Sequence, residues 1–127
     1  MKRFLFGLCL FFLVAASWEV GAWDKIDYQR LLATKKCVKC DLTAAYLSGA
    51  DLVFTNMSGA NLSGADLSEA NLFYTNLSGA DLSETNLSGA DLNEVNLSAA
   101  DLEGANLTET KFCETKMPNG TINNSSC

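Results

Sequence analysis

The stretch "LVFTNMSGA", residues 52 to 60, recurs as "LFYTNLSGA" at residues 72 to 80, an offset of twenty. Both stretches belong to a pattern with a period of five, in which fifteen large apolar residues stand at every fifth position from 42 to 112. Thirteen of them are Leu, and the exceptions are Met57 and Phe112. A small residue usually lies two positions before each one, with Asp or Asn between them. This regularity decides the fold.

A period of five fits neither an α-helix nor an ordinary β-strand, whose periods are about 3.6 and 2. Each pentad instead predicts a very short extended segment, with the small residue and the Leu on its inner side, followed by a corner. Because such a segment cannot bury its Leu alone, the pentads must wind into coils that stack. The offset of twenty predicts four pentads in each coil, which places Phe54 beneath Tyr74 and Val53 beneath Phe73.

Runs such as "SGADLSEANLFYTNLSGADLSETNLSGADL", residues 63 to 92, resemble the pentapeptide-repeat family, whose motif is A(D/N)Lxx. The resemblance covers residues 40 to 114. It implies an all-β fold, a right-handed quadrilateral β-helix of about 3.75 coils with the Leu and the small residues inward. The segments on either side of the repeat are similar to those of exported pentapeptide-repeat proteins of cyanobacteria; they read "RLLATKKCVKCDL" and "FCETKMPNGTINNSSC". This similarity implies that the protein is located in the periplasm or the thylakoid lumen.

Residues 1–22 have the layout of a secretory signal peptide. Two basic residues precede an apolar run of 13 residues from Phe4 to Ala16, and small residues then suit cleavage after Ala16 or Ala22. The run is shorter than the ~20 residues that a membrane-spanning helix needs. We therefore expect export to the periplasm, the thylakoid lumen or the extracellular space, with no stable membrane insertion after cleavage.

The two ends of the repeat need caps, because an open solenoid exposes unpaired backbone groups and apolar core. Residues 23–39 are expected to form a helical N-terminal cap, since they begin with acidic and end with basic side chains. Residues 115–127 form a polar tail with a Pro118-Asn119-Gly120 turn signal, and we expect them to lie across the other end as a second cap.

Four cysteines remain after removal of the signal peptide, and an even number in a small exported chain predicts disulfides. Three pairings are possible; the interpretation we favour pairs neighbours at each end, and the four residues are Cys37, Cys40, Cys113 and Cys127. A Cys113–Cys127 bridge would close a 15-residue loop, worth about 3 kcal/mol in the chain-entropy model. The two pairs cannot share a zinc ion, because coils stacked at ~4.8 Å hold them at opposite ends of a rod ~18 Å long.

The composition argues against enzymatic chemistry, because the chain has no His and the usual general base is missing. We expect no catalytic residue, no cofactor and no metal site. From Asp41 to Glu114 the chain carries twelve acidic residues and a single Lys. The outward Asp and Asn residues form ladders, whose side chains are expected to bond the corner backbone.

The candidate functional residues are Val53, Phe54, Phe73 and Tyr74, which interrupt the Ser/Gly/Asp surface on two successive coils. Exposed aromatic residues clustered on a polar surface suggest a partner site. There are two alternatives: the N-terminal segment covers these side chains, or the rings only stack on one another between coils and so stiffen the solenoid. We interpret the protein as a non-enzymatic, exported, rigid interaction or structural module for a protein partner of unknown identity, with no nucleic-acid ligand.

Two other functions stay open at this point. Some members of the family mimic DNA and bind type II topoisomerases, and one charge per ~1.6 Å of rod is close to the ~1.7 Å of duplex DNA. The second alternative is a thiol-redox protein that uses Cys37 and Cys40, whose C-x-x-C spacing is that of a redox pair.

Overall fold

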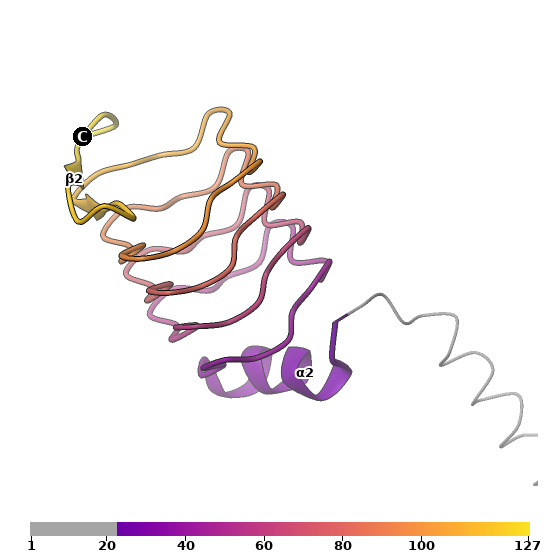
Figure 1. Cartoon of the computed structure of the whole chain (residues 1–127). Helices are drawn as coiled ribbons and strands as arrows, with labels where there is room; N and C mark the ends of the chain where they lie inside the picture. The colour runs from indigo at the N-terminus through magenta and orange to yellow at the C-terminus, as the bar shows by residue number, and fades with distance from the viewer. Residues whose placement is uncertain (1–22) are drawn as a thin grey trace, which may run out of the picture.

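The computed structural model describes residues 23–127, so the expected signal peptide lies outside the described residues. The chain winds into a stack of square coils, with a helix beneath the first coil and two short strands beside the last (Figure 1). The helix α2 spans Lys25–Thr34, and the strands β1 (Thr115–Lys116) and β2 (Ile122–Asn123) pair antiparallel. Within this part of the chain, no helix is long and apolar enough to cross a membrane.

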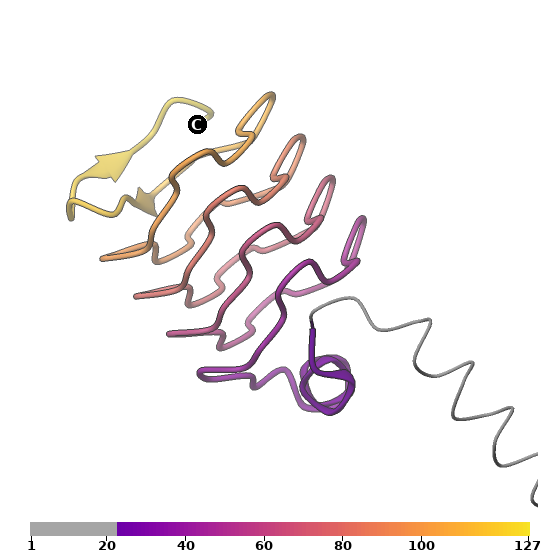
Figure 2. The same ribbon diagram turned by 45° about the vertical axis from the view of Figure 1, so that its right-hand side comes forward.

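Thirteen isolated parallel bridges join residues that are twenty apart, so the predicted offset of one coil is confirmed. The bridges extend one pentad beyond each end of the repeat, from Lys36 to Lys116. They define four faces, which Figure 2 shows as successive sides of each coil. The bridging residues are Asp41, Asn61, Asp81 and Asp101 on the first face; Tyr46, Asp66, Asn86 and Asn106 on the second; Asp51, Asn71, Asp91 and Lys111 on the third; Lys36, Asn56, Asn76, Asn96 and Lys116 on the fourth.

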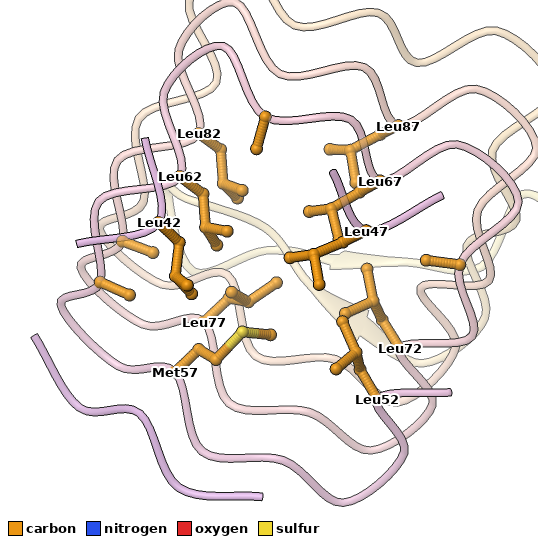
Figure 3. Close-up of a cluster of buried hydrophobic side chains, with 14 of the residues drawn as sticks. Leu42, Leu47, Leu52, Met57, Leu62, Leu67, Leu72, Leu77, Leu82 and Leu87 are labelled. Atoms are coloured by element: carbon orange, nitrogen blue, oxygen red, sulfur yellow. The ribbon is translucent and has the colours of Figure 1, made fainter. Parts of the chain in front are cut away.

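The core consists of columns of Leu side chains, one column for each face (Figure 3). Leu42, Leu62 and Leu82 form one such column and are fully buried. Each buried Leu contributes about 2 kcal/mol of hydrophobic stabilisation. Four of the inward Thr hydroxyls are satisfied by a Leu carbonyl of the coil below, as where Thr75 Oγ1 donates to Leu52 O at 2.6 Å. Thr85, Thr110 and Thr115 repeat this bond at 2.8 Å, whereas Thr55 in the first coil donates to Val53 O at 3.4 Å.

Each corner is a tight turn of four residues that begins at the Leu, and its third residue, the second after the Leu, has a positive φ, between 52° and 72° from Lys39 to Glu114. The turn is closed by the next small residue, as where Ala45 N donates to Leu42 O at 3.0 Å. A turn of this kind requires positive φ at its third residue, which Gly adopts without strain and other residues adopt at a cost. The Asp or Asn before the Leu steadies the corner, because its Oδ1 accepts a bond from the N–H two residues on. The expected structural role of the ladders is confirmed by these bonds.

The helix α2 closes the lower end of the solenoid. Asp24 caps its first turn by accepting from Ile26 N at 2.7 Å, and Leu31 is fully buried beneath the Leu columns. Asp27 Oδ2 accepts from Asp41 N at 2.8 Å, which ties the helix to the first coil. The helix occupies the middle of the 23–39 segment in which a cap was expected, and Lys35 ends it with a φ of 57°.

The C-terminal tail covers only part of the upper end. Lys116 O and Pro118 O accept from Leu97 N and Ala99 N, which completes the fourth face. The last residues fold back over the third face, where Ser126 Oγ accepts from Phe112 N at 3.0 Å. The first and second faces of the last coil, residues 101–110, receive no such cover (Figure 2). Of the cap that was expected across this end, the structure shows tail contacts on the third and fourth faces, because the tail turns back at β2 after crossing them.

Candidate functional site

Four residues at the third corner of two successive coils, Val53, Phe54, Phe73 and Tyr74, form what we call the aromatic corner. The solenoid positions them by stacking alone, since Asp51 and Asn71 bridge on the face that leads into this corner. Phe54 and Tyr74 are 67% and 57% exposed. Val53 and Phe73 are half-buried. The sequence placed the four residues together correctly, but two rather than four of them present a largely exposed side chain.

The three rings of the aromatic corner contact one another. Phe54 meets Phe73 edge-on, with ring centroids 5.9 Å apart and planes at 89°. The Phe54 and Tyr74 centroids are 5.3 Å apart, and those of Phe73 and Tyr74 are 5.8 Å apart. Aromatic pairs of this kind contribute about 0.5–1.5 kcal/mol beyond their buried area. The cluster therefore ties two coils together and also presents a preformed apolar surface.

The backbone at the exposed rings is strained. Phe54 and Tyr74 have φ values of 55° and 60°, in the left-handed region. This region costs a bulky residue roughly 1–2 kcal/mol. Gly occupies the same turn position at the next corner of both coils, as Gly59 and Gly79. The same φ recurs at non-Gly residues of other corners, such as Ala44, Glu69 and Glu84, so the turn imposes it and the strain by itself assigns no function to the rings.

The surroundings of the aromatic corner are polar and uncovered. Glu94 and Glu114 continue the same corner in the two coils above, and both are exposed. At its base, Lys35 Nζ donates to Asp51 O at 2.9 Å and lies 3.6 Å from Asp51 Oδ1. The exposure of Phe54 and Tyr74 shows that residues 23–36 do not cover them. Asn93 Oδ1, on the coil above Phe73, is buried and has no hydrogen-bond partner among the described residues.

The fourth face, which adjoins the aromatic corner, carries no acidic side chain among its bridging residues or in the corners that follow them. Asn56, Asn76 and Asn96 each accept a bond on Oδ1 from the Ser two residues on. The acidic residues of the repeat lie on the other three faces and their corners. Composition alone did not indicate this segregation, although assigning the residues to columns of twenty would have revealed it.

Two cysteine pairs lie at disulfide-bonding distance, one at each end of the solenoid. The sulfur atoms of Cys37 and Cys40 are 2.03 Å apart, and those of Cys113 and Cys127 are 2.02 Å apart. Cys37 and Cys40 are 1% and 2% exposed. A redox pair needs an accessible, activated thiolate, so this burial argues against the thiol-redox alternative.

The acidic ladders show no built metal site. Among residues 23–127, no group of three or more His, Cys, Asp or Glu side chains could hold a metal ion. Asp81 and Asp101 stack on the first face, but each accepts its own corner N–H on Oδ1. Hydrogen bonds from the Ser83 hydroxyl and backbone N–H lower the pKa of Asp81, and burial opposes this only weakly. These carboxylates therefore act as corner acceptors.

The model of the family described as pentapeptide repeats matches residues 40–79 and 75–112 of the chain. Among solved structures, the chain is 38% identical over 61% of its length to HetL, a pentapeptide repeat protein involved in heterocyst differentiation regulation from the cyanobacterium Nostoc sp. strain PCC 7120, with a TM-score of 0.35. It covers 40% of HetL, so it spans well under two thirds of that protein's length.

Two further solved structures are similar. One is a second pentapeptide repeat protein of Nostoc PCC 7120, at 32% identity over 66% of this chain and 69% of that one, with a TM-score of 0.48. The other is a pentapeptide repeat protein from the thylakoid lumen of Arabidopsis thaliana, at 28% identity over 77% of this chain and 69% of that one, also with a TM-score of 0.48. No curated protein sequence matches the chain significantly.

Proposed function

The chain belongs to the pentapeptide-repeat family, and from this premise we propose that it is a non-enzymatic, rigid module that binds a protein partner through the aromatic corner. Family membership places the solenoid among the right-handed β-helices. Such a solenoid has little freedom to close around a small substrate, because each coil contacts only its neighbours. Its surface residues are instead held in fixed columns, which suits recognition of another macromolecule.

The observation that carries this proposal is the exposure of Phe54 and Tyr74 within a preformed cluster of three rings. Stacking alone would explain the ring contacts, but it does not explain why two large aromatic side chains stay 67% and 57% exposed on an otherwise polar surface. Large aromatic side chains dominate the energetics of protein interfaces. Because the three rings already contact one another in the free protein, they also lose little conformational entropy when a partner binds.

We further propose that the protein works after export. The motivation is the two cysteine pairs at disulfide-bonding distance, one at each end of the solenoid. Disulfides form and persist in oxidising compartments such as the periplasm or the extracellular space. The signal-peptide layout of residues 1–22 points the same way.

The test is a double substitution of Phe54→Gly and Tyr74→Gly. Gly relieves roughly 1 kcal/mol of backbone strain at each corner, and losing the ring contacts costs a similar amount. We therefore expect the free energy of unfolding to change by less than about 1 kcal/mol. Partner binding is measured by placing a photo-crosslinking benzoylphenylalanine at position 74 and identifying the crosslinked protein in an extract of the exported compartment.

The matched control is Glu94→Gly with Glu114→Gly, which changes the same corner two coils higher, where φ is 61° and 52°. We expect this control to keep affinity for the identified partner, and the aromatic double variant to lose it. The proposal fails if the aromatic variant binds as well as the wild type. A loss of more than about 2 kcal/mol of unfolding free energy, with binding unchanged, would instead assign the rings to cross-coil stabilisation.

A further inference from the structure

The uncovered half of the last coil, residues 101–110, is an open sheet edge with regularly spaced backbone groups. Throughout the lower coils, the N–H of each Leu and of each second corner residue donates to the coil above, as Leu82 N donates to Asp101 O at 2.8 Å and Glu84 N to Glu103 O at 2.8 Å. In the last coil, the equivalent donors have no protein partner within residues 23–127; they are the N–H groups of Leu102, Gly104, Leu107 and Glu109. The equivalent acceptors, Ala100 O and Ala105 O, also lack one.

The apolar core is exposed at the same place. Leu102 and Leu107 are half-buried, whereas the Leu residues beneath them, Leu82 and Leu87, are fully buried. The tail covers the other half of the same coil, where Ser126 Oγ and Asn124 Oδ1 accept from Phe112 N and Glu114 N. One coil therefore contains both a covered and an uncovered half, built from the same repeat.

The side chains around the uncovered half are acidic. Asp101, Glu103 and Glu109 surround it, all three are exposed, and no Lys or Arg lies between positions 101 and 110. A basic segment is attracted by this rim, while a second copy of the chain would place three carboxylates against three. A second copy also matches poorly in hydrogen bonding, since the edge has four free donors and two free acceptors, and two such edges facing each other leave donors unpaired.

We infer that residues 101–110 form a second binding surface, which accepts one extended, basic segment of a partner protein by strand addition over Leu102 and Leu107. A segment that follows the path of a further coil offers two carbonyls and one N–H for each face, which is the complement of the edge beneath it. Backbone bonds of this kind supply affinity, and alternate side chains supply specificity. This surface lies at the end of the solenoid, on the first and second faces, and its occupancy does not depend on the aromatic corner.

The experiment uses the ten-residue peptide AKLSGAKLSG, a copy of the repeat with Lys at the outward positions, at up to about 1 mM. Residue-resolved amide hydrogen exchange of the protein is measured by NMR with and without the peptide. We expect slower exchange at Leu102, Gly104, Leu107 and Glu109, and no change at Leu82 or Glu84, whose N–H groups are already bonded. The Asp version of the peptide, ADLSGADLSG, should give no protection.

A rim variant, Asp101→Asn with Glu103→Gln and Glu109→Gln, removes the charges and keeps an oxygen acceptor at position 101. We expect it to bind the Lys peptide about tenfold more weakly, because the attraction between the three rim carboxylates and the two Lys side chains of the peptide is lost. The control variant Asp66→Asn, Glu69→Gln and Asp91→Asn changes the net charge equally but lies below the edge, and should bind within about twofold of the wild type.

Several results would overturn the inference. One is no protection at any peptide concentration, and another is equal binding to the rim and control variants. Protection of the same four amides by the protein's own self-association, seen by sedimentation as a dimer, would make a second copy the occupant. If the wild type binds no peptide and the rim variant aggregates, the acidic rim serves only to keep the edge from pairing.

Discussion

The two ends of the solenoid are closed by different means and to different degrees. At the lower end, α2 lays Leu31 against the core and bonds the first coil through Asp27. At the upper end, the tail supplies backbone and side-chain bonds to two faces and leaves Leu102 and Leu107 half-buried. A helix has no free backbone groups along its side and can cover a whole end, whereas a single returning segment pairs only with the faces that it crosses.

The largest expected effect comes from a matched pair of substitutions at the two ends. Leu31→Ala should lower the free energy of unfolding by about 3 kcal/mol, because the side chain is fully buried and its loss leaves a cavity. Leu107→Ala should cost about 1 kcal/mol, since the half-exposed site can fill with water. Urea denaturation followed by circular dichroism measures both. Equal losses would contradict the difference between the two ends.

Removal of the disulfides is the next test. In the chain-entropy model, the 14-residue separation of Cys113 and Cys127 predicts a loss of about 3 kcal/mol, and the 3-residue separation of Cys37 and Cys40 about 2 kcal/mol. We expect the C-terminal pair, changed to Ser, to lower the thermal midpoint more. Amide exchange in the same variant should rise first at Phe112 and Glu114, which depend on the tail. A larger loss from the N-terminal pair would mean that α2, not the tail, depends on its cysteines.

Glycines at the two ends provide a third comparison. A Cβ at Gly104, in the last coil, would overlap the carboxylate of Glu84, which extends over it from the coil below. A Cβ at Gly49, in the first coil, meets nothing within 4 Å. Both have positive φ, 72° and 67°, so each Gly→Ala costs about 1 kcal/mol of backbone strain. Gly104→Ala should cost up to about 1 kcal/mol more, and Glu84→Ala should abolish this excess in chemical denaturation.

The smallest predicted effect is on pH dependence in the coil just below the open edge. The pKa of Asp81 is lowered by its bonds from Ser83, so it falls below the ordinary value of 3.8. A lowered folded pKa means that this contribution to stability is present above the ordinary pKa and is lost as the pH falls through the folded value. Since Asp81 is only half-buried and water screens its charge, we expect less than about 1 kcal/mol. Comparing wild type with Ser83→Ala at pH 5 and pH 3 isolates it: the stability difference between them should shrink at pH 3.

Several features of the fold could be predicted because they depend only on local pattern. The Leu at every fifth position and the doubled apolar pair at positions 53–54 and 73–74 gave the offset of twenty, which the bridge between Asp51 and Asn71 reproduces. The Asn and Asp corner bonds follow from side chains too short to reach anything else. The aromatic corner was identified for the same reason, since a residue's column depends only on its position in the repeat.

Other features could not be predicted from the pattern. Phe54 and Phe73 differ in exposure because of their places in the turn: up to residue 99, the first residue after each Leu is half-buried, and the second is exposed at every corner except Gly89. The turn geometry that decides this is not visible in the pentad sequence. The positive φ at this turn position, where Glu94 and Glu114 follow Phe54 and Tyr74 in the coils above, likewise became visible only in the backbone angles. The tail was expected to lie across the upper end, but the sequence indicates only a turn at residues 118–120 and not which faces the chain crosses after it.

The sequence by itself determined the repeat, the size of one coil, the inward Leu columns and the grouping of four apolar residues at one corner. These are consequences of short-range periodicity, in which each pentad has the same relation to the pentad twenty residues away. Only the tertiary structure decided which faces the tail crosses and which half of the last coil lacks a cover. Those features depend on where non-repeating segments lie, and no periodic rule governs the path of α2 or of the tail beyond β1.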